Sequence, residues 1–201
     1  MKPQNFLFLC FILAMQSCVS TAHIENEWSA PDQKIDSTKM FQKILFVALL
    51  KDNPTRRIAE DKLVAEVRPR GVASYSYLGA VNTTPNEGLI ADRLRQDGFD
   101  GVVVMRLAEA DKNKNYVPGS YPSYYSSWYG YYSTTYPRYN DPNYYSSATV
   151  YNIETNVYSL KDNKLLWTGI TTAPNLSDKK AMMDRVIAMI KQKMKSQGVL
   201  K

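Results

Sequence analysis

The chain has 201 residues, a length that predicts one domain, and such a domain can bury a core without a metal or disulfide staple. Its hydrophobic fraction of 44% and charged fraction of 22% are ordinary for a globular protein and exclude a chain of strongly biased composition. The formal net charge is +6, and the 15 tyrosines are the one compositional outlier.

The first residues are typical of an export signal. Residues 6–15 form an unbroken apolar run of ten, preceded by a short polar stretch that contains Lys2. A membrane-spanning helix needs about 20 apolar residues, so this run is too short to span a bilayer and fits the core of a secretory signal. We therefore predict a signal peptide over residues 1–17.

Cys18 follows this core and resembles the acylated cysteine of a bacterial lipoprotein box. Ser17 supplies the small residue before the cysteine, and Met15 supplies the apolar residue three positions before it. The resemblance implies cleavage before Cys18 and attachment of several acyl chains such as palmitate, which together hold a protein firmly on a membrane. The alternative is ordinary cleavage after Ala22. The other cysteine, Cys10, lies in the signal core, so the processed chain has no disulfide.

The domain is predicted to begin after a polar segment. Residues 18–40 show no helix or strand period and are interpreted as a tether. Residues 43–50 form a continuous apolar run, as expected for a central strand covered on both faces. Asn53 as a cap and Pro54 in the first turn predict that a helix begins next. Its buried stripe is Ala59, Leu63 and Val67.

Two further strands are predicted, with a second helix between them. Residues 72–78 alternate between polar and apolar side chains, as a strand does. Thr84 as a cap, with Glu87 three residues later, predicts a helix start, and Gly98 closes that helix. Residues 102–105 are then a second continuous apolar strand.

Residues 115–147 interrupt this alternation of strands and helices. The 33 residues include 11 tyrosines, Trp128 and four prolines, but almost no aliphatic side chains. Such a segment cannot build a core of its own, and a long loop inside a compact domain is usually functional or disordered. We predict an extended hairpin tip whose aromatic side chains contact a partner. The predicted contact residues are Tyr124, Tyr125, Trp128, Tyr129, Tyr131 and Tyr132. The alternative is a solvated or self-packed loop that binds nothing.

A hairpin and a final helix complete the chain. Residues 149–157 alternate along a long strand, residues 161–164 form a turn, and residues 165–170 return as an antiparallel strand. Trp167 in the returning strand is interpreted as a core residue, and Ser177 is predicted to cap the last helix. The apolar stripe of that helix is Met183, Val186, Ile187, Ile190 and Met194.

The basic excess of the chain lies on this last helix. Residues 177–201 hold seven Lys or Arg residues and two Asp residues. We interpret the charge as the solvated outer face of the helix, with lysines near its C-terminus that suit the helix dipole. The alternative is a surface that contacts anionic lipid or glycan.

Together these elements predict a single α/β domain of two or three layers over residues 41–201. Their order is β-α-β-α-β, followed by an antiparallel β-hairpin and a C-terminal helix. The first half predicts parallel strands joined by crossover helices, and the hairpin extends the same sheet with antiparallel strands.

Four features carry a resemblance to a family of small uncharacterised bacterial lipoproteins. They are the opening strand-helix unit, the helix-to-strand step at residues 98–104, the Tyr-rich insertion, and the hairpin sequence at residues 164–167. That family is similar in layout to the α/β domains of the curli secretion component and of the TolB N-terminal domain. The resemblance covers about residues 40–200 and implies a cell-envelope role but no active site. By the same resemblance, Val19 in place of an Asp implies the outer membrane, facing the periplasm.

Several chemistries are missing from the predicted domain. The single histidine, His23, lies in the tether, and no cysteine follows Cys18. Nucleophile pairs with histidine, Cys/His metal clusters and Gly-rich phosphate loops are therefore excluded. We predict that the protein is not an enzyme and carries no cofactor or metal. Four acidic residues keep open the alternative of a carboxylate-based glycan-processing enzyme of the periplasm. They are Asp97, Asp100, Glu109 and Asp111.

The sequence thus predicts a lipid-anchored interaction or structural lipoprotein of the cell envelope. Its partner is predicted to be an envelope protein or a cell-wall glycan, bound through the Tyr-rich insertion. Nucleic acid is excluded as a partner because Arg138 is the single basic residue in the insertion, so charges and aromatic rings are not interleaved.

Overall fold

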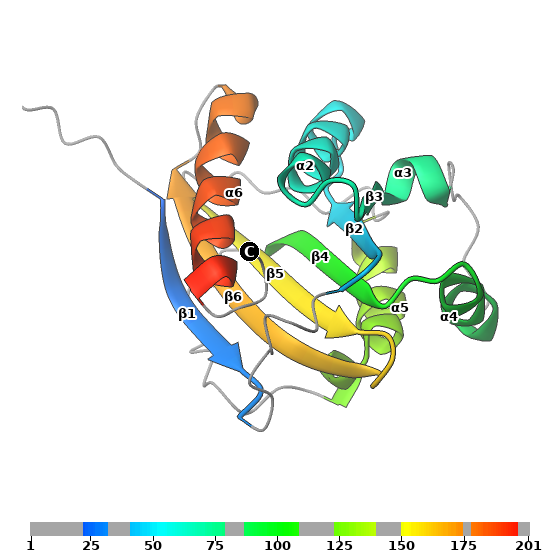
Figure 1. The fold of residues 1–201 in the computed structure, drawn as a ribbon. Helices are drawn as coiled ribbons and strands as arrows, with labels where there is room; N and C mark the ends of the chain where they lie inside the picture. The colour runs from blue at the N-terminus through cyan, green and yellow to red at the C-terminus, as the bar shows by residue number, and fades with distance from the viewer. Residues whose placement is uncertain are drawn as a thin grey trace, which may run out of the picture.

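The computed structural model describes residues 22–31, 41–78, 87–108, 123–139, 150–174 and 178–196. These residues hold a mixed six-stranded sheet with helices on both faces (Figure 1), which confirms the α/β class. The strands are β1 (His23–Ser29), β2 (Ile44–Leu49), β3 (Gly71–Ala73), β4 (Gly101–Ala108), β5 (Val150–Ser159) and β6 (Lys164–Pro174). The helices are α2 (Asn53–Glu66), α3 (Ser74–Tyr77), α4 (Glu87–Gln96), the 3₁₀ turn η1 (Ser123–Ser126), α5 (Trp128–Tyr139) and α6 (Lys179–Ser196).

The centre of the sheet is parallel. The strand order is β1-β6-β5-β4-β2-β3, and β2 pairs in parallel with both β3 and β4. β5 pairs antiparallel with β4 and with β6, as expected of a hairpin that extends the sheet. All six residues of β2 are buried, because helices cover both faces of this strand.

One face of the sheet packs against α2 and α6 and forms the first core. Along β2, Ile44, Phe46 and Ala48 face this core, since side chains of a strand alternate between the two faces. The predicted stripes of both helices are buried here, and so is Trp167. Asp52, and not Asn53, caps α2, because the Asp52 carboxylate accepts a hydrogen bond from the Thr55 backbone nitrogen at 2.9 Å.

The opposite face packs against α4, η1 and α5 and forms the second core. Leu45, Val47 and Leu49 of β2 point into it, together with Leu94 of α4, which is fully buried. Gly98 ends α4 as predicted, at a φ of +79° that glycine adopts without strain. With helices on both faces, the domain has three layers.

Two parts of the sequence interpretation are wrong. Residues 23–29, expected as part of a plain tether, form β1 and pair antiparallel with β6 at the edge of the sheet. The sequence does not indicate this strand, because an edge strand with both faces partly solvated shows little alternation of polar and apolar side chains. Residues 74–77 form the short helix α3, so the strand predicted over residues 72–78 ends at Ala73.

Some predicted positions lie outside the described residues. They are the signal peptide, Cys18, and the helix caps Thr84 and Ser177. No helix in the described ranges is long and apolar enough to cross a membrane.

Candidate functional site

The described part of the Tyr-rich insertion, residues 123–139, does not project from the sheet. It folds as η1 and α5 and packs on the second face. The predicted contact surface is wrong for four of its residues, because their side chains are buried in the second core. Their exposed fractions are 1% for Tyr125, 1% for Trp128, 0% for Tyr131 and 3% for Tyr132. Aromatic rings supply the apolar area that aliphatic side chains usually provide, so this segment contributes to the core.

Two half-buried tyrosines, Tyr129 and Tyr136, lie at the edge of the core-facing side of α5 and pack against the second core. Tyr129 was predicted as a contact residue, whereas Tyr136 was not. The Tyr136 ring stacks on the Tyr132 ring, with centroids 5.0 Å apart and planes at 25°. Residues 129, 132 and 136 follow the three- and four-residue spacing of a helix, a period that the loop interpretation overlooked. Tyr124, the sixth predicted residue, lies in η1.

A buried ion pair lies beneath this aromatic segment. Arg106 of β4 and Glu154 of β5 stand opposite each other in the antiparallel register, with Nε and Oε2 2.8 Å apart. Their side chains are 12% and 1% exposed. The Tyr125 hydroxyl accepts from Arg106 and donates to Glu154, each at 3.2 Å, and Asn156 donates to Oε1 of Glu154 at 2.7 Å. Both charges are therefore hydrogen-bonded, as buried charges must be.

Tyr131 packs on this network without joining it. Its ring centroid lies 5.1 Å from that of Tyr125 and 5.7 Å from the guanidinium carbon of Arg106. Within the described residues, its hydroxyl has no hydrogen-bond partner. Burial, followed by the charge of Glu154, raises the pKa of Tyr131 well above its ordinary value of 10.0.

Two variants that each remove one tyrosine hydroxyl distinguish the hydrogen-bonded Tyr125 from Tyr131, which only packs on the network. We expect Tyr125→Phe to lower the free energy of unfolding by about 2 kcal/mol, because it removes hydrogen bonds to charged groups. Tyr131→Phe should change it by less than about 0.5 kcal/mol at pH 7, because no bond is lost. Urea unfolding followed by circular dichroism measures both, and equal losses in the two variants would contradict the assigned contacts.

The raised pKa of Tyr131 adds a pH dependence. Below pH 10 the tyrosine is protonated in both states, and its full contribution to stability is present. Above pH 10 the unfolded state releases the proton while the folded state retains it, so stability falls as the pH rises. The same unfolding measurement, made at pH 7 and pH 11, should therefore show a smaller fall in the free energy of unfolding for Tyr131→Phe than for the wild type.

A second buried carboxylate ties α2 to the sheet. Glu60 of α2 is fully buried, and its Oε1 accepts from the Ala48 backbone nitrogen at 2.9 Å and the Ser74 hydroxyl at 2.7 Å. Oε1 also accepts from Nε of Arg56 at 3.1 Å, and Oε2 accepts from the Tyr75 backbone nitrogen at 2.9 Å. The cluster lies where β2 ends, a common place for ligands in α/β proteins. However, four protein donors already occupy this carboxylate, so it acts as a structural tie.

The acidic residues of the enzyme alternative have local partners where they are described. Asp100 accepts from the backbone nitrogens of Gln42 at 2.8 Å and Lys43 at 3.0 Å. Asp97 accepts a hydrogen bond from the Tyr77 hydroxyl. Glu109 and Asp111 lie outside the described residues. Among the residues that are described, no group of three or more His, Cys, Asp or Glu side chains is placed to hold a metal ion.

No protein-family model and no curated protein matches this chain. Among solved structures, it is similar to the PelC dodecamer from Paraburkholderia phytofirmans, with a TM-score of 0.44, 8% identity, and coverage of 90% of this chain and 99% of that chain. A PelC variant from the same organism gives a TM-score of 0.41, 8% identity, and coverage of 84% and 95%. A likeness of this degree establishes neither a shared fold nor a shared function.

Proposed function

We propose that this protein is an exported, lipid-anchored binding protein of a bacterial cell envelope, and that it contacts an envelope protein or glycan through the half-buried tyrosines of α5. The anchor is Cys18, and the proposed compartment is the outer membrane, facing the periplasm.

The observation that carries this proposal is the aromatic side of α5. Tyr129 and Tyr136 are half-buried, so each ring is fixed by neighbours on one side and open to solvent on the other. The Trp128 ring stands edge-on to Tyr129, with centroids 6.4 Å apart at 88°, and the Tyr132 ring stacks against Tyr136. Rings held in this way offer a rigid, amphipathic contact at low entropic cost, which suits a polymer or protein surface.

The bonding of the two buried carboxylates supports a binding role over a catalytic one. Glu154 is bonded to Arg106, Tyr125 and Asn156, and Glu60 is bonded to four donors. A general acid or base must reach a substrate proton, and carboxylates occupied in this way are poorly suited to that task. Asp97 and Asp100 are likewise bonded to local partners, so among the described residues no specific contact favours the carboxylate-based glycan-processing enzyme.

A matched set of tyrosine variants tests the binding surface. We expect Tyr129→Ser combined with Tyr136→Ser to weaken binding to purified cell-wall glycan, or recovery of crosslinked envelope proteins, at least tenfold. Tyr151→Ser is the control, because this tyrosine packs against the first core on the opposite face of the sheet. Thermal melting first establishes that all variants are folded. Unchanged binding in the double variant, or an equal loss in the control, would show that α5 is not the contact surface.

A further inference from the structure

Two helices, α2 and α6, and the strand β1 all begin at the same end of the sheet. Because β5 is antiparallel to both β4 and β6, β6 runs parallel to β4 and β2, and these three strands end together at what we call the carboxyl end. α2 follows β2 and α6 follows β6, so both helices begin there, and the Lys62–Asp184 ion pair joins them side by side. β1 also begins there, since His23 lies opposite Thr172 of β6 (Figure 1).

Chain length then restricts where a lipid on Cys18 can lie. Ala22 is half-buried and packs against the first core, so the domain holds the chain up to that residue. Three residues lie between Cys18 and Ala22, which makes four Cα–Cα steps, and an extended chain spans at most about 3.6 Å per step. The Cα atom of Cys18 therefore lies within about 14 Å of the Cα atom of Ala22. An acylated Cys18 would hold the carboxyl end close to the bilayer surface.

The side chains at the carboxyl end suit such a surface. Among the described residues, the basic side chains near this end include Lys51, Arg57, Lys179 and Lys180. Of the acidic side chains, Asp52 and Asp178 cap the first turns of α2 and α6 by accepting backbone hydrogen bonds, so they offset the helix dipoles. Glu25 of β1 lies beside His23, with Oε1 and Nε2 3.7 Å apart. Lys179 lies over the Tyr151 ring, with Nζ 4.8 Å from the ring centroid. Lys51, Arg57 and Lys180 are exposed and supply the positive charge that attracts anionic phospholipid headgroups.

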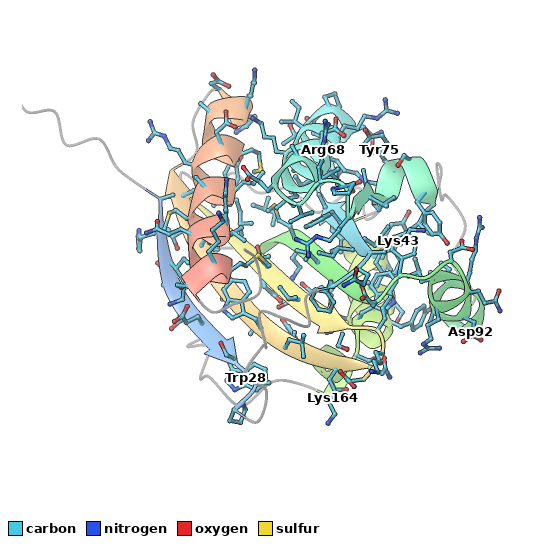
Figure 2. All side chains as sticks on the ribbon, viewed as in Figure 1. Trp28, Lys43, Arg68, Tyr75, Asp92 and Lys164 are labelled. Atoms are coloured by element: carbon cyan, nitrogen blue, oxygen red, sulfur yellow. The ribbon has the colours of Figure 1, made fainter. Side chains whose placement is uncertain are left out.

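We infer that the domain stands end-on on an anionic phospholipid bilayer, with the carboxyl end of its sheet against the headgroups and the β5–β6 turn pointing away. This inference rests on the proposed acylation of Cys18. β6 has 11 residues, so Lys164 at its start lies roughly 35 Å from the carboxyl end. Figure 2 shows Lys164 at the opposite end of the β5–β6 hairpin from the start of β1 in Figure 1.

Fluorescent labels at three exposed positions test this orientation on the acylated protein in vesicles of phosphatidylglycerol and phosphatidylcholine. Asn53→Cys reports the carboxyl end, Lys164→Cys the opposite end, and Gln192→Cys the side of α6. With a quencher on the lipid headgroups, we expect at least threefold stronger quenching at Asn53 than at either other position. Equal quenching at Gln192, or stronger quenching at Lys164, would overturn the end-on arrangement.

Charge reversal separates contact with the lipid from simple tethering. Lys51→Glu combined with Lys180→Glu should at least halve the quenching at the Asn53 label. Lys161→Glu combined with Lys195→Glu makes the same change in net charge, but away from the carboxyl end. This pair should leave the quenching at the Asn53 label unchanged. Equal effects of the two pairs, or no effect of the first, would overturn the proposed lipid contact.

Intact-mass analysis of the same preparation distinguishes the two proposals. An acyl mass on Cys18 with the wrong quenching pattern refutes the orientation and leaves the anchor in place. A mature chain that begins at His23, or that carries no acyl mass, refutes the anchor and with it the orientation.

Discussion

Replacing Glu60 by glutamine is expected to lower the free energy of unfolding by about 3 kcal/mol, because the change removes the charge of a fully buried carboxylate. One of its two oxygens becomes an amide group that donates hydrogen bonds, yet the neighbours of both oxygens are themselves donors. The loss corresponds to a fall in melting temperature of roughly 10 °C for a domain of this size. Urea and thermal unfolding followed by circular dichroism measure it.

The control for this variant lies on the same helix. Glu66 of α2 forms an ion pair with Lys191 of α6, and about a third of each side chain is exposed. Surface pairs of this kind contribute little, so Glu66→Gln should cost less than about 1 kcal/mol. Similar losses at Glu60 and Glu66 would mean that the tie between α2, β2 and α3 does not stabilise the domain as described.

Truncating Trp128 to alanine is expected to lower the free energy of unfolding by about 3–5 kcal/mol, the usual cost of removing a buried aromatic side chain. Trp128 is 1% exposed and lies in the second core, where its ring centroid is 5.0 Å from that of Tyr132. The large loss is expected because α5 covers the sheet. If the Tyr-rich segment were a solvated loop, the substitution would leave stability unchanged.

The neighbouring residue supplies the comparison for this second variant. Tyr129 is half-buried at the edge of the core-facing side of α5, so Tyr129→Ala should cost clearly less than Trp128→Ala. The same unfolding measurement ranks the two variants. A larger loss at Tyr129 than at Trp128 would mean that α5 presents the opposite side to the sheet.

The sequence was most informative where apolar side chains follow a regular period. β2 is recognisable because its run of apolar residues is continuous, and α6 because its stripe of buried residues repeats every three or four positions. Those two patterns locate the first core before any coordinates are known. Gly98 likewise marks the end of α4, because a residue at positive φ favours glycine.

The candidate site was less predictable because tyrosine side chains suit both the packing of a core and contact with a partner. A tyrosine-rich segment without aliphatic residues resembles a loop in composition, although its rings can fill a core. Its helical spacing at residues 129, 132 and 136 distinguishes α5 from a loop, but composition hid that signal. The Arg106–Glu154 pair depends on the register of β4 against β5, which no local pattern specifies.

The position of β1 has a consequence for the order in which the domain assembles. His23 and Thr172 are register partners although they are 149 positions apart in the chain, 172 less 23. During synthesis the N-terminal segment of a polypeptide emerges first, whereas β6 follows only after most of the domain. Pairing across so long a separation carries a high closure entropy and forms late. We therefore expect β1 to pair with β6 after the rest of the sheet has formed, and this pairing completes the sheet.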